Sequence, residues 1–299
     1  MINRFGRSAY LYVILGASLW GTIGLFVDVL YKAGFTAMQI VALRVISAAI
    51  MLVVYLALKK PSLLKIDWKD LFSFIGTGIF SIVLFNWSYF SAIEEVSLSI
   101  AVILLYTGPI FVTLLSRLVF NEKLTTRKVI ALCVTILGCA LVIKVIPAGD
   151  QHISLYGFAI GLLSGFAYAL YSIFGKFVLQ KYESLTVITY TFVVASLFML
   201  PVSGPGFSTA QFASGKIWMI VIGLGLIPTV IAYLLYTMGL AMIESSRASI
   251  AATVEPLVAS IIGVVIFNEV LSAYQLLGMV LVLAAVIMVQ FKSKVPAPR

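Results

Sequence analysis

Two charged residues stand deep inside long apolar stretches of the chain. Arg44 lies about eight residues into the run at 36–58, and Glu255 lies about ten residues into the run at 246–267. With a helical rise of 1.5 Å per residue, each position is roughly 12 to 15 Å from the end of its helix. A charge at such a depth in a membrane costs roughly 2.5 to 3.5 kcal/mol for Arg, so it normally faces a polar cavity or a partner. These positions therefore predict a polar site near the middle of a helical bundle.

The chemistry of this pair has two open interpretations. In the first, Glu255 contacts a substrate ammonium or binds a coupling proton, while Arg44 anchors a carboxylate or balances Glu255. In the second, Arg44 extends outward to water, or the two residues form a static ion pair that only fixes helix packing.

Aromatic and amide side chains gather on the same predicted helices. A cavity with aromatic walls and a few polar groups suits amphipathic solutes, such as apolar amino acids or aromatic cations. Such side chains also fill cores and form belts at membrane interfaces, so we expect only some of them to contact a substrate. The candidates for binding are Trp20, Asn86, Trp87, Tyr89, Tyr106, Tyr171, Tyr233 and Tyr236, and Tyr168 belongs to the same cluster.

Pro109 and Pro256 occupy the middle of two apolar runs. Proline removes a backbone N–H and clashes with the carbonyl four residues back, so each should kink its helix. Bent helices near the midplane often border the binding site of a carrier, although a bend can also serve packing alone.

The composition requires a membrane. Hydrophobic residues make up 62% of the 299 residues and charged residues 10%, against roughly 45 to 50% and about 25% in soluble domains. Since a helical span needs about 20 apolar residues, the hydropathy pattern predicts an all-α integral membrane protein with ten transmembrane helices. We place them near 9–31, 36–58, 70–92, 97–119, 126–146, 154–179, 185–202, 216–240, 246–267 and 272–291.

The basic residues predict the orientation, because Lys and Arg collect on the cytoplasmic side of a membrane. With both termini inside, only Lys32, Lys144 and Lys216 lie outside, and Arg44 lies within a span. The sixteen inner residues are Arg4, Arg7, Lys59, Lys60, Lys65, Lys69, Arg117, Lys123, Arg127, Lys128, Lys176, Lys181, Arg247, Lys292, Lys294 and Arg299. This dispersal over short loops also excludes nucleic-acid binding. We expect a multi-pass protein of the cell inner (cytoplasmic) membrane.

The chain repeats itself after 147 residues. Tyr89 then falls on Tyr236, Pro109 falls on Pro256, and the phrase FNExL recurs at 120–124 and 267–271. A repeat of five spans contains an odd number, so the second copy must enter the membrane from the opposite side. The predicted copies are residues 9–146 and 154–291.

These residues resemble the drug/metabolite transporter superfamily, EamA-type. The matching phrases are GASLWG at 16–21, Arg44, Pro109 followed by Glu122-Lys-Leu, and Glu255-Pro256 followed by Glu269-Val-Leu. The second copy departs from the pattern, since Phe166 lies near the place of the tryptophan. The resemblance implies a secondary transporter that moves small metabolites by alternating access, with export of amino acids or related compounds as the expected activity. Metabolite uptake or multidrug efflux is the alternative.

Other classes of protein fit the sequence less well. No GxxxxGK[ST] phosphate loop is present, so ATP does not drive the protein directly. We expect no enzyme, because no acidic metal cluster or nucleophile with a base lies in a membrane-facing loop. A channel would assemble rings of like groups from several chains. We therefore expect no cofactor or metal, and a monomer or weak homodimer whose partners are a small-molecule substrate, a possible coupling proton and the lipid bilayer.

Two further expectations concern packing and capping. Gly157, Gly161 and Gly165 have the spacing that permits close contact between helices. Glu122 and Glu269, in the two FNExL hairpins, are predicted to cap the N-terminus of a neighbouring helix. Four acids near span ends are expected to be solvated: Asp28, Glu94, Glu95 and Glu244.

Overall fold

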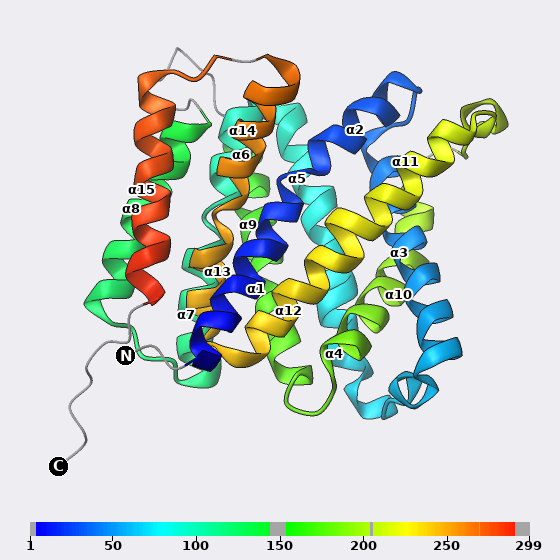
Figure 1. Ribbon diagram of the computed structural model, residues 1–299, viewed down its shortest axis with the longest axis horizontal. Coiled ribbons are helices and arrows are strands. Elements are labelled where there is room, and N and C mark those ends of the chain that lie inside the picture. The colour runs from blue at the N-terminus through cyan, green and yellow to red at the C-terminus, as the bar shows by residue number, and fades with distance from the viewer. Residues whose placement is uncertain (1–3, 144–153, 204–205, 269, 291–299) are drawn as a thin grey trace.

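The computed structural model describes residues 4–143, 154–203, 206–268 and 270–290, which form a bundle of helices without strands (Figure 1). The first copy of the repeat contains α1 (Arg4–Trp20), α2 (Ile23–Lys32), α3 (Ala37–Lys59), α4 (Leu71–Ile75), a π-helix (Gly76–Val83), α5 (Leu84–Glu95), α6 (Leu98–Leu105), α7 (Gly108–Phe120) and α8 (Thr126–Val142). The second copy contains α9 (Leu155–Val178), α10 (Ser184–Val202), α11 (Gly215–Gly225), a π-helix (Leu226–Ile231), α12 (Ala232–Met242), α13 (Ser245–Ala252), α14 (Glu255–Phe267) and α15 (Ala273–Gln290).

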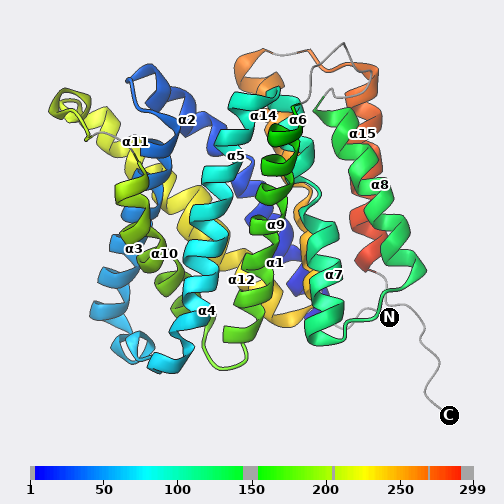
Figure 2. The same cartoon turned by 180° about the vertical axis from the view of Figure 1, so that it is seen from behind.

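Nine helical segments of the described chain are long and apolar enough to cross a membrane. The tenth predicted span is α8, which has 17 described residues and lies alongside α15 at one edge of the bundle (Figures 1 and 2). The arrangement confirms the predicted fold class, an all-α membrane protein of ten helices in two inverted repeats.

The bundle has two ends, at which different helices begin and end. α1 begins and α15 ends at one of them, which we call the termini end and which lies at the bottom of Figure 1. The other is called the far end, and it holds the end of α2, the start of α6 and the end of α14. Since α9 starts at the far end whereas α1 starts at the termini end, the two copies run in opposite directions.

The repeat is visible helix by helix. α6 and α13 begin and end 147 residues apart, and so do α7 and α14. Both α7 and α14 end at an asparagine in the left-handed conformation, with φ of 54° at Asn121 and 56° at Asn268. Asparagine tolerates this conformation, which closes a helix by satisfying its last carbonyls. The repeated FNExL phrase therefore encodes the same helix stop twice.

The prolines stand at interruptions of the helices. α6 ends at Leu105 and α7 starts at Gly108, so Pro109 is the second residue of the new helix. Pro256 holds the equivalent place in α14. In the first turn of a helix the missing N–H of proline leaves no hydrogen bond unmade. Each of these membrane-crossing segments is therefore broken just before its proline, where a bend at the proline was expected.

The glycines of α9 bring this helix close to α6. A Cβ at Gly161 would lie 2.4 Å from the Leu104 side chain, and one at Gly165 would lie 2.7 Å from the Leu104 carbonyl oxygen. Larger side chains would force the two helices apart. The predicted close contact through small residues is thus confirmed.

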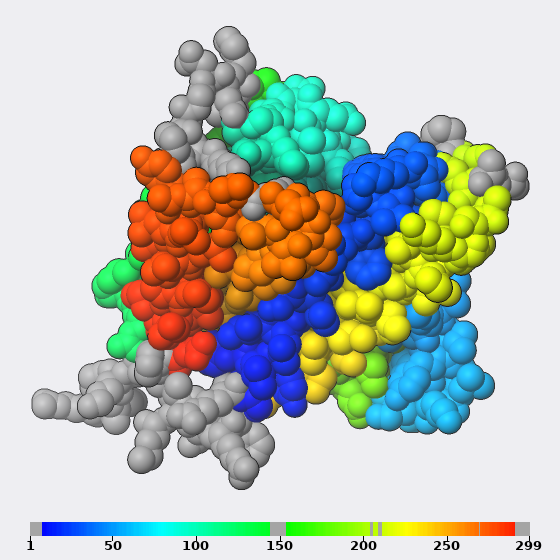
Figure 3. Space-filling model, turned by 45° about the horizontal axis from the view of Figure 1, so that its top comes forward, coloured from blue at the N-terminus to red at the C-terminus, as the bar shows by residue number. Residues whose placement is uncertain are grey.

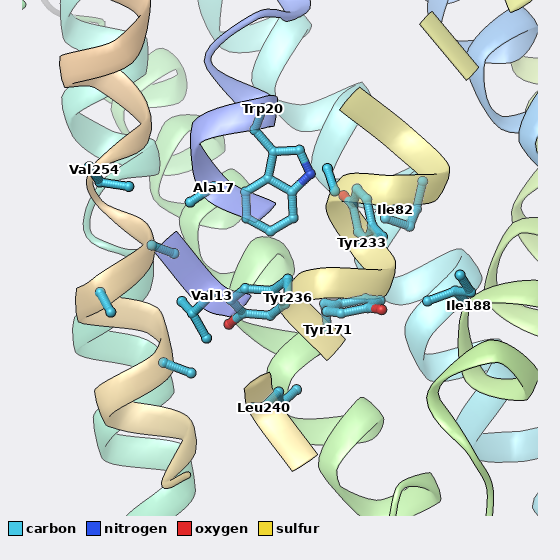
Figure 4. Close-up of a cluster of buried hydrophobic side chains, with 14 of the residues drawn as sticks. Val13, Ala17, Trp20, Ile82, Tyr171, Ile188, Tyr233, Tyr236, Leu240 and Val254 are labelled. Atoms are coloured by element: carbon cyan, nitrogen blue, oxygen red, sulfur yellow. The ribbon is translucent and has the colours of Figure 1, made fainter. Parts of the chain in front are cut away.

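An aromatic core joins the two copies at the centre of the bundle (Figure 4). Trp20 of α1 lies 5.0 Å from the Tyr233 ring and 5.1 Å from the Tyr236 ring, measured between centroids. Tyr171 of α9 packs edge-on against Tyr233 at 5.2 Å. These rings form one buried core, to which both copies of the repeat contribute.

Candidate functional site

A cavity of about 700 Å³ extends from the central aromatic core to the far end of the bundle. Its walls come from both copies of the repeat, with α2, α3, α5 and α6 on one side and α9, α12 and α14 on the other. Figure 3 tilts the far end toward the viewer, where α14 (orange), α2 (blue) and the teal segment around α6 meet. The cavity thus lies at the interface of the two inverted repeats.

Arg44 and Glu255 both line this cavity, from α3 and from the first turn of α14. The Arg44 side chain is 7% exposed, and its Nε has no hydrogen-bond partner. Within the described residues neither charged group forms an ion pair, with the other or with a third residue. The carboxylate of Glu255 gains support from the helix N-terminus on which it sits. The protein thus holds one cation and one anion at the same cavity without pairing them.

Besides Tyr31, which is 46% exposed, four tyrosines give the cavity an aromatic wall with polar tips. Tyr89, Tyr106, Tyr168 and Tyr233 line it, and in the described part of the chain none of their hydroxyls is hydrogen-bonded to protein. By contrast, Tyr171 bonds Thr237 at 2.6 Å and Tyr236 bonds Ser172 at 2.7 Å. Buried tyrosine hydroxyls normally find a partner, so the four cavity tyrosines are available to a solute or water, and the other two belong to the packed floor.

The predicted site residues fall into three groups. Tyr171 and Tyr236 lie beneath the floor of the cavity, around a small hollow bordered by Trp20. Trp87 is 41% exposed on the outside of α5, and Pro109 is buried in α7; neither lines the cavity. The residues that do line it are Trp20, Arg44, Asn86, Tyr89, Tyr106, Tyr233, Glu255 and Pro256.

Further polar residues of the cavity were not among the predicted binding candidates. Tyr31, Ser99, Ser260 and Gln275 also line it. The Gln275 amide donates to the Val142 carbonyl at 3.1 Å, which ties α15 to α8. The sequence repeat could have pointed to Ser99 and Gln275, because the 147-residue offset aligns these polar residues with two other polar residues, Ser246 and Lys128. No group of three His, Cys, Asp or Glu in the searched, described residues has the geometry of a metal site.

The termini end is closed by four charged residues, Glu122, Lys128, Glu244 and Arg247, which we call the ion cluster. Glu122 accepts hydrogen bonds from the backbone N–H of Ser245 at 2.6 Å and of Ser246 at 3.2 Å. Its carboxylate also binds the Ser246 hydroxyl. Glu122 therefore caps the N-terminus of α13, as predicted for this acid. Glu269, the matching acid of the second copy, lies outside the described residues.

The remaining members of the ion cluster connect α13 to α8 and α15. Lys128 Nζ lies 3.1 Å from Glu244 and 3.6 Å from Glu122, and the Lys128 side chain is 4% exposed. Arg247 pairs with Glu244 at 2.5 Å and donates to the Val289 carbonyl at 3.0 Å. Glu244 was expected to be solvated, yet it is 39% exposed and held by two cations. Burial raises the pKa of this carboxyl, but Lys128 and Arg247 outweigh that effect, so its pKa lies below the usual value.

Comparison with known proteins agrees with this architecture. The sequence matches the EamA-like transporter family at residues 7–144 and again at 155–291. An uncharacterized transporter of Archaeoglobus fulgidus is 28% identical over 284 residues, covering 95% of this chain and 96% of the relative. The uncharacterized transporter YxxF of Bacillus subtilis is 27% identical over 284 residues, covering 93% of this chain and 88% of the relative.

A solved crystal structure shares the fold. It superposes with a TM-score of 0.79 at 19% sequence identity and covers 94% of this chain and 96% of its own. The family match takes in both copies of the repeat, and the relatives named as transporters extend over nearly the whole chain. The protein is therefore a multi-pass membrane transporter, and it belongs to the EamA-like transporter family.

Proposed function

We propose that the protein carries small zwitterionic metabolites of the amino-acid class across the cytoplasmic membrane by alternating access, and that it exports them. The observation that supports this substrate class is the unpaired Arg44 and Glu255 on one cavity. The volume of about 700 Å³ lies within the range of small-molecule sites. It leaves room for a side chain beside the two charged groups of a free amino acid.

Charge compensation favours a zwitterion over a singly charged solute. A carboxylate at Arg44 and an ammonium at Glu255 would satisfy both residues at once. A pure anion or a pure cation would leave one charge unpaired in a site closed to water, and such a charge is strongly destabilising. The tyrosine faces supply an apolar and cation-attracting wall, which suits a hydrophobic side chain next to an ammonium.

The proposed cycle uses both ends of the bundle. Positive residues concentrate at the termini end, which we assign to the cytoplasm. The described conformation would then be open to the outside and closed toward the cytoplasm by the ion cluster. The two copies, predicted as residues 9–146 and 154–291, would rock against each other so that the opposite end opens. Glu255 would receive either the substrate ammonium or a coupling proton.

The test is counterflow into liposomes that contain the purified protein. We expect labelled phenylalanine to accumulate against preloaded phenylalanine, whereas phenethylamine and 3-phenylpropionate, which each lack one charged group, do not compete. Arg44→Gln and Glu255→Gln should each lower counterflow by at least about tenfold, the equivalent of 1.4 kcal/mol. The matched control is Asp28→Asn, because Asp28 pairs with Lys32 outside the cavity. Equal competition by phenethylamine would indicate a cation carrier and reject the zwitterion assignment.

A further inference from the structure

The closed half of the bundle buries an unusual set of hydroxyl groups. Six residues that we call the hydroxyl seam lie between the central aromatic core and the ion cluster: Thr113 and Ser116 of α7, Thr237 of α12, Ser246 and Ser249 of α13, and Thr253 directly after α13. Each of them is at most 3% exposed. α13 packs on α7 and also contacts α12, so the elements that carry the seam adjoin one another through α13.

Every member of the hydroxyl seam has a repeat partner that lines the open cavity. The 147-residue offset pairs Ser246 and Ser249 with Ser99 and Val102 of α6, and Thr253 with Tyr106 directly after α6. It pairs Thr113 and Ser116 with Ser260 and Gly263 of α14, and Thr237 with Phe90 of α5. Because α6 and α13 have the same length and offset, these are equivalent faces of equivalent helices. One face borders a cavity and the other is shut.

Four of the six seam hydroxyls bond only to nearby carbonyls of their own chain segment, whereas Ser246 binds Glu122 and Thr237 binds Tyr171 across helices. Thr113 donates to the Pro109 carbonyl at 2.8 Å, Ser249 to Ser246 at 3.0 Å and Thr253 to Ile250 at 2.7 Å, all within one chain segment. Ser116 likewise bonds Thr113 of its own helix. Separating α7 from α13 would break none of these bonds. Hydroxyls that bond only within their own helix add little to the contact between α7 and α13, but they can bind water or a solute if the seam opens.

We infer that the hydroxyl seam is the second half of the substrate path, a cavity that forms at the termini end when the far end closes. This inference rests on the proposed alternating access and adds where the other cavity lies and which residues line it. Its lining of small hydroxyls suits solutes that form hydrogen bonds, such as amino acids, and would exclude large lipophilic compounds. The ion cluster closes the opening of this path at the termini end, because Glu122 binds the N-terminus of α13.

Three single-cysteine variants test the inference, in a full-length chain from which Cys133 and Cys139 have been replaced by serine. Ser249→Cys reports the seam, and Val102→Cys reports its repeat partner in the open cavity. Ala248→Cys is the matched control: Ala248 is 0% exposed on the same helix, and its repeat partner Ala101 does not line the cavity. The readout is the rate of modification by a trimethylammonium methanethiosulfonate reagent in detergent, followed by mass spectrometry.

We expect the Val102→Cys variant to react fastest, and the Ser249→Cys variant to react at least about tenfold faster than the Ala248→Cys variant. Adding Lys128→Gln, which removes the central cation of the ion cluster, should speed the reaction at position 249 and slow it at position 102. Equal rates at 248 and 249 in both backgrounds would overturn the inference, because the seam would then be ordinary packing. A parallel rise at all three positions would overturn it too, since it would mean a loosened bundle.

Counterflow in liposomes separates this inference from the proposed function. Selective reaction at position 249 without amino-acid counterflow would reject the substrate assignment and retain the path. Amino-acid counterflow without selective reaction at position 249 would reject the path and retain the substrate.

Discussion

The half-helices α6 and α13 are the same element in the two copies, yet their ends are held differently. α6 is capped locally, because the Ser97 side chain accepts from the Ile100 N–H at 3.3 Å. α13 has no side-chain cap of its own and is capped by Glu122, which follows the end of α7. At the equivalents of Lys128, Glu244 and Arg247 the other copy carries Gln275, Ser97 and Ile100. The two copies therefore share a fold but differ in charge. The termini end is closed by charged side chains, and the far end is open where the three equivalent positions are uncharged.

This difference shows that different residues determine the symmetry of the backbone and the relative stability of its two conformations. The repeated helices make two arrangements available. The unrepeated charges stabilise one of them. A change at the ion cluster should then alter the balance between open and closed ends without altering the fold.

The largest effect is expected from Lys128→Gln, which installs the residue of the other copy. Lys128 is buried between Glu122 and Glu244, and its removal leaves the Glu122 carboxylate, which is 8% exposed, without a cation, at a cost of about 3 to 5 kcal/mol. Glu244 keeps its pair with Arg247. We expect a lower melting temperature in detergent and a larger population open at the termini end, measured by cysteine modification at position 249. Lys123→Gln is the control, since this lysine is exposed five residues away. Unchanged melting would show that the cluster does not hold this end.

Glu122→Gln should have a smaller effect. The amide oxygen can still accept one N–H of α13, but the charge and one hydrogen bond are lost, which costs about 1.5 to 3 kcal/mol. Combined with Lys128→Gln it should destabilise less than the sum of the two single changes, because the double variant leaves no unpaired charge between these positions. Additive changes in melting temperature would mean that the two side chains act independently.

Acid should weaken the closed end more modestly, through Glu244. Because Lys128 and Arg247 hold its pKa below the usual value, its contribution to stability is present above the unfolded pKa of about 4.3. That contribution is lost as the pH falls through the lowered folded value. We expect the melting temperatures of the unmodified protein and of Glu244→Gln to converge as the pH falls below about 4. A constant difference down to pH 3 would contradict this assignment.

The smallest effect is expected from Lys181→Gln, which removes another ionic group at the same end. Lys181 bridges Asp67 and Asp70 at the surface, and its side chain is 51% exposed. These two carboxylates raise the pKa of Lys181, yet exposed pairs contribute little to stability in water. Neither melting nor modification at position 249 should change. A shift like that of Lys128→Gln would mean that overall charge at this end, and not the buried cluster, controls closure.

The sequence predicted the elements well because membrane spans impose strong rules. Ten apolar runs, the offset of 147 residues and the glycines of α9 all reappear in the structure, since each depends on local composition or spacing. The break before Pro109 was expected as a kink, because proline marks the place of an irregularity and the surrounding contacts decide its form. Glu122 was recognised as a cap from the repeated phrase alone.

The site was predicted less completely. Arg44 and Glu255 stood out because a charge is rare in a span, and both line the cavity. The aromatic candidates could not be sorted from sequence, because Trp87, Tyr171 and Tyr233 have similar composition around them and differ only in which neighbour each faces. Glu244 was taken as solvated because the proximity of Lys128 and Arg247 arises from packing between helices.

By itself, the sequence determined the class of the protein, the number and order of its helices, the inverted repeat and the two charges that must be buried. Lipid accepts only apolar helices with satisfied backbones, so these features follow from residue type and spacing. Only the tertiary structure decided which half is open, which tyrosines are free to bind and which hydroxyls are shut away. Those features depend on how the two copies pack against each other. A symmetric pair can pack in two ways, and a few contacts that are not repeated stabilise one of them.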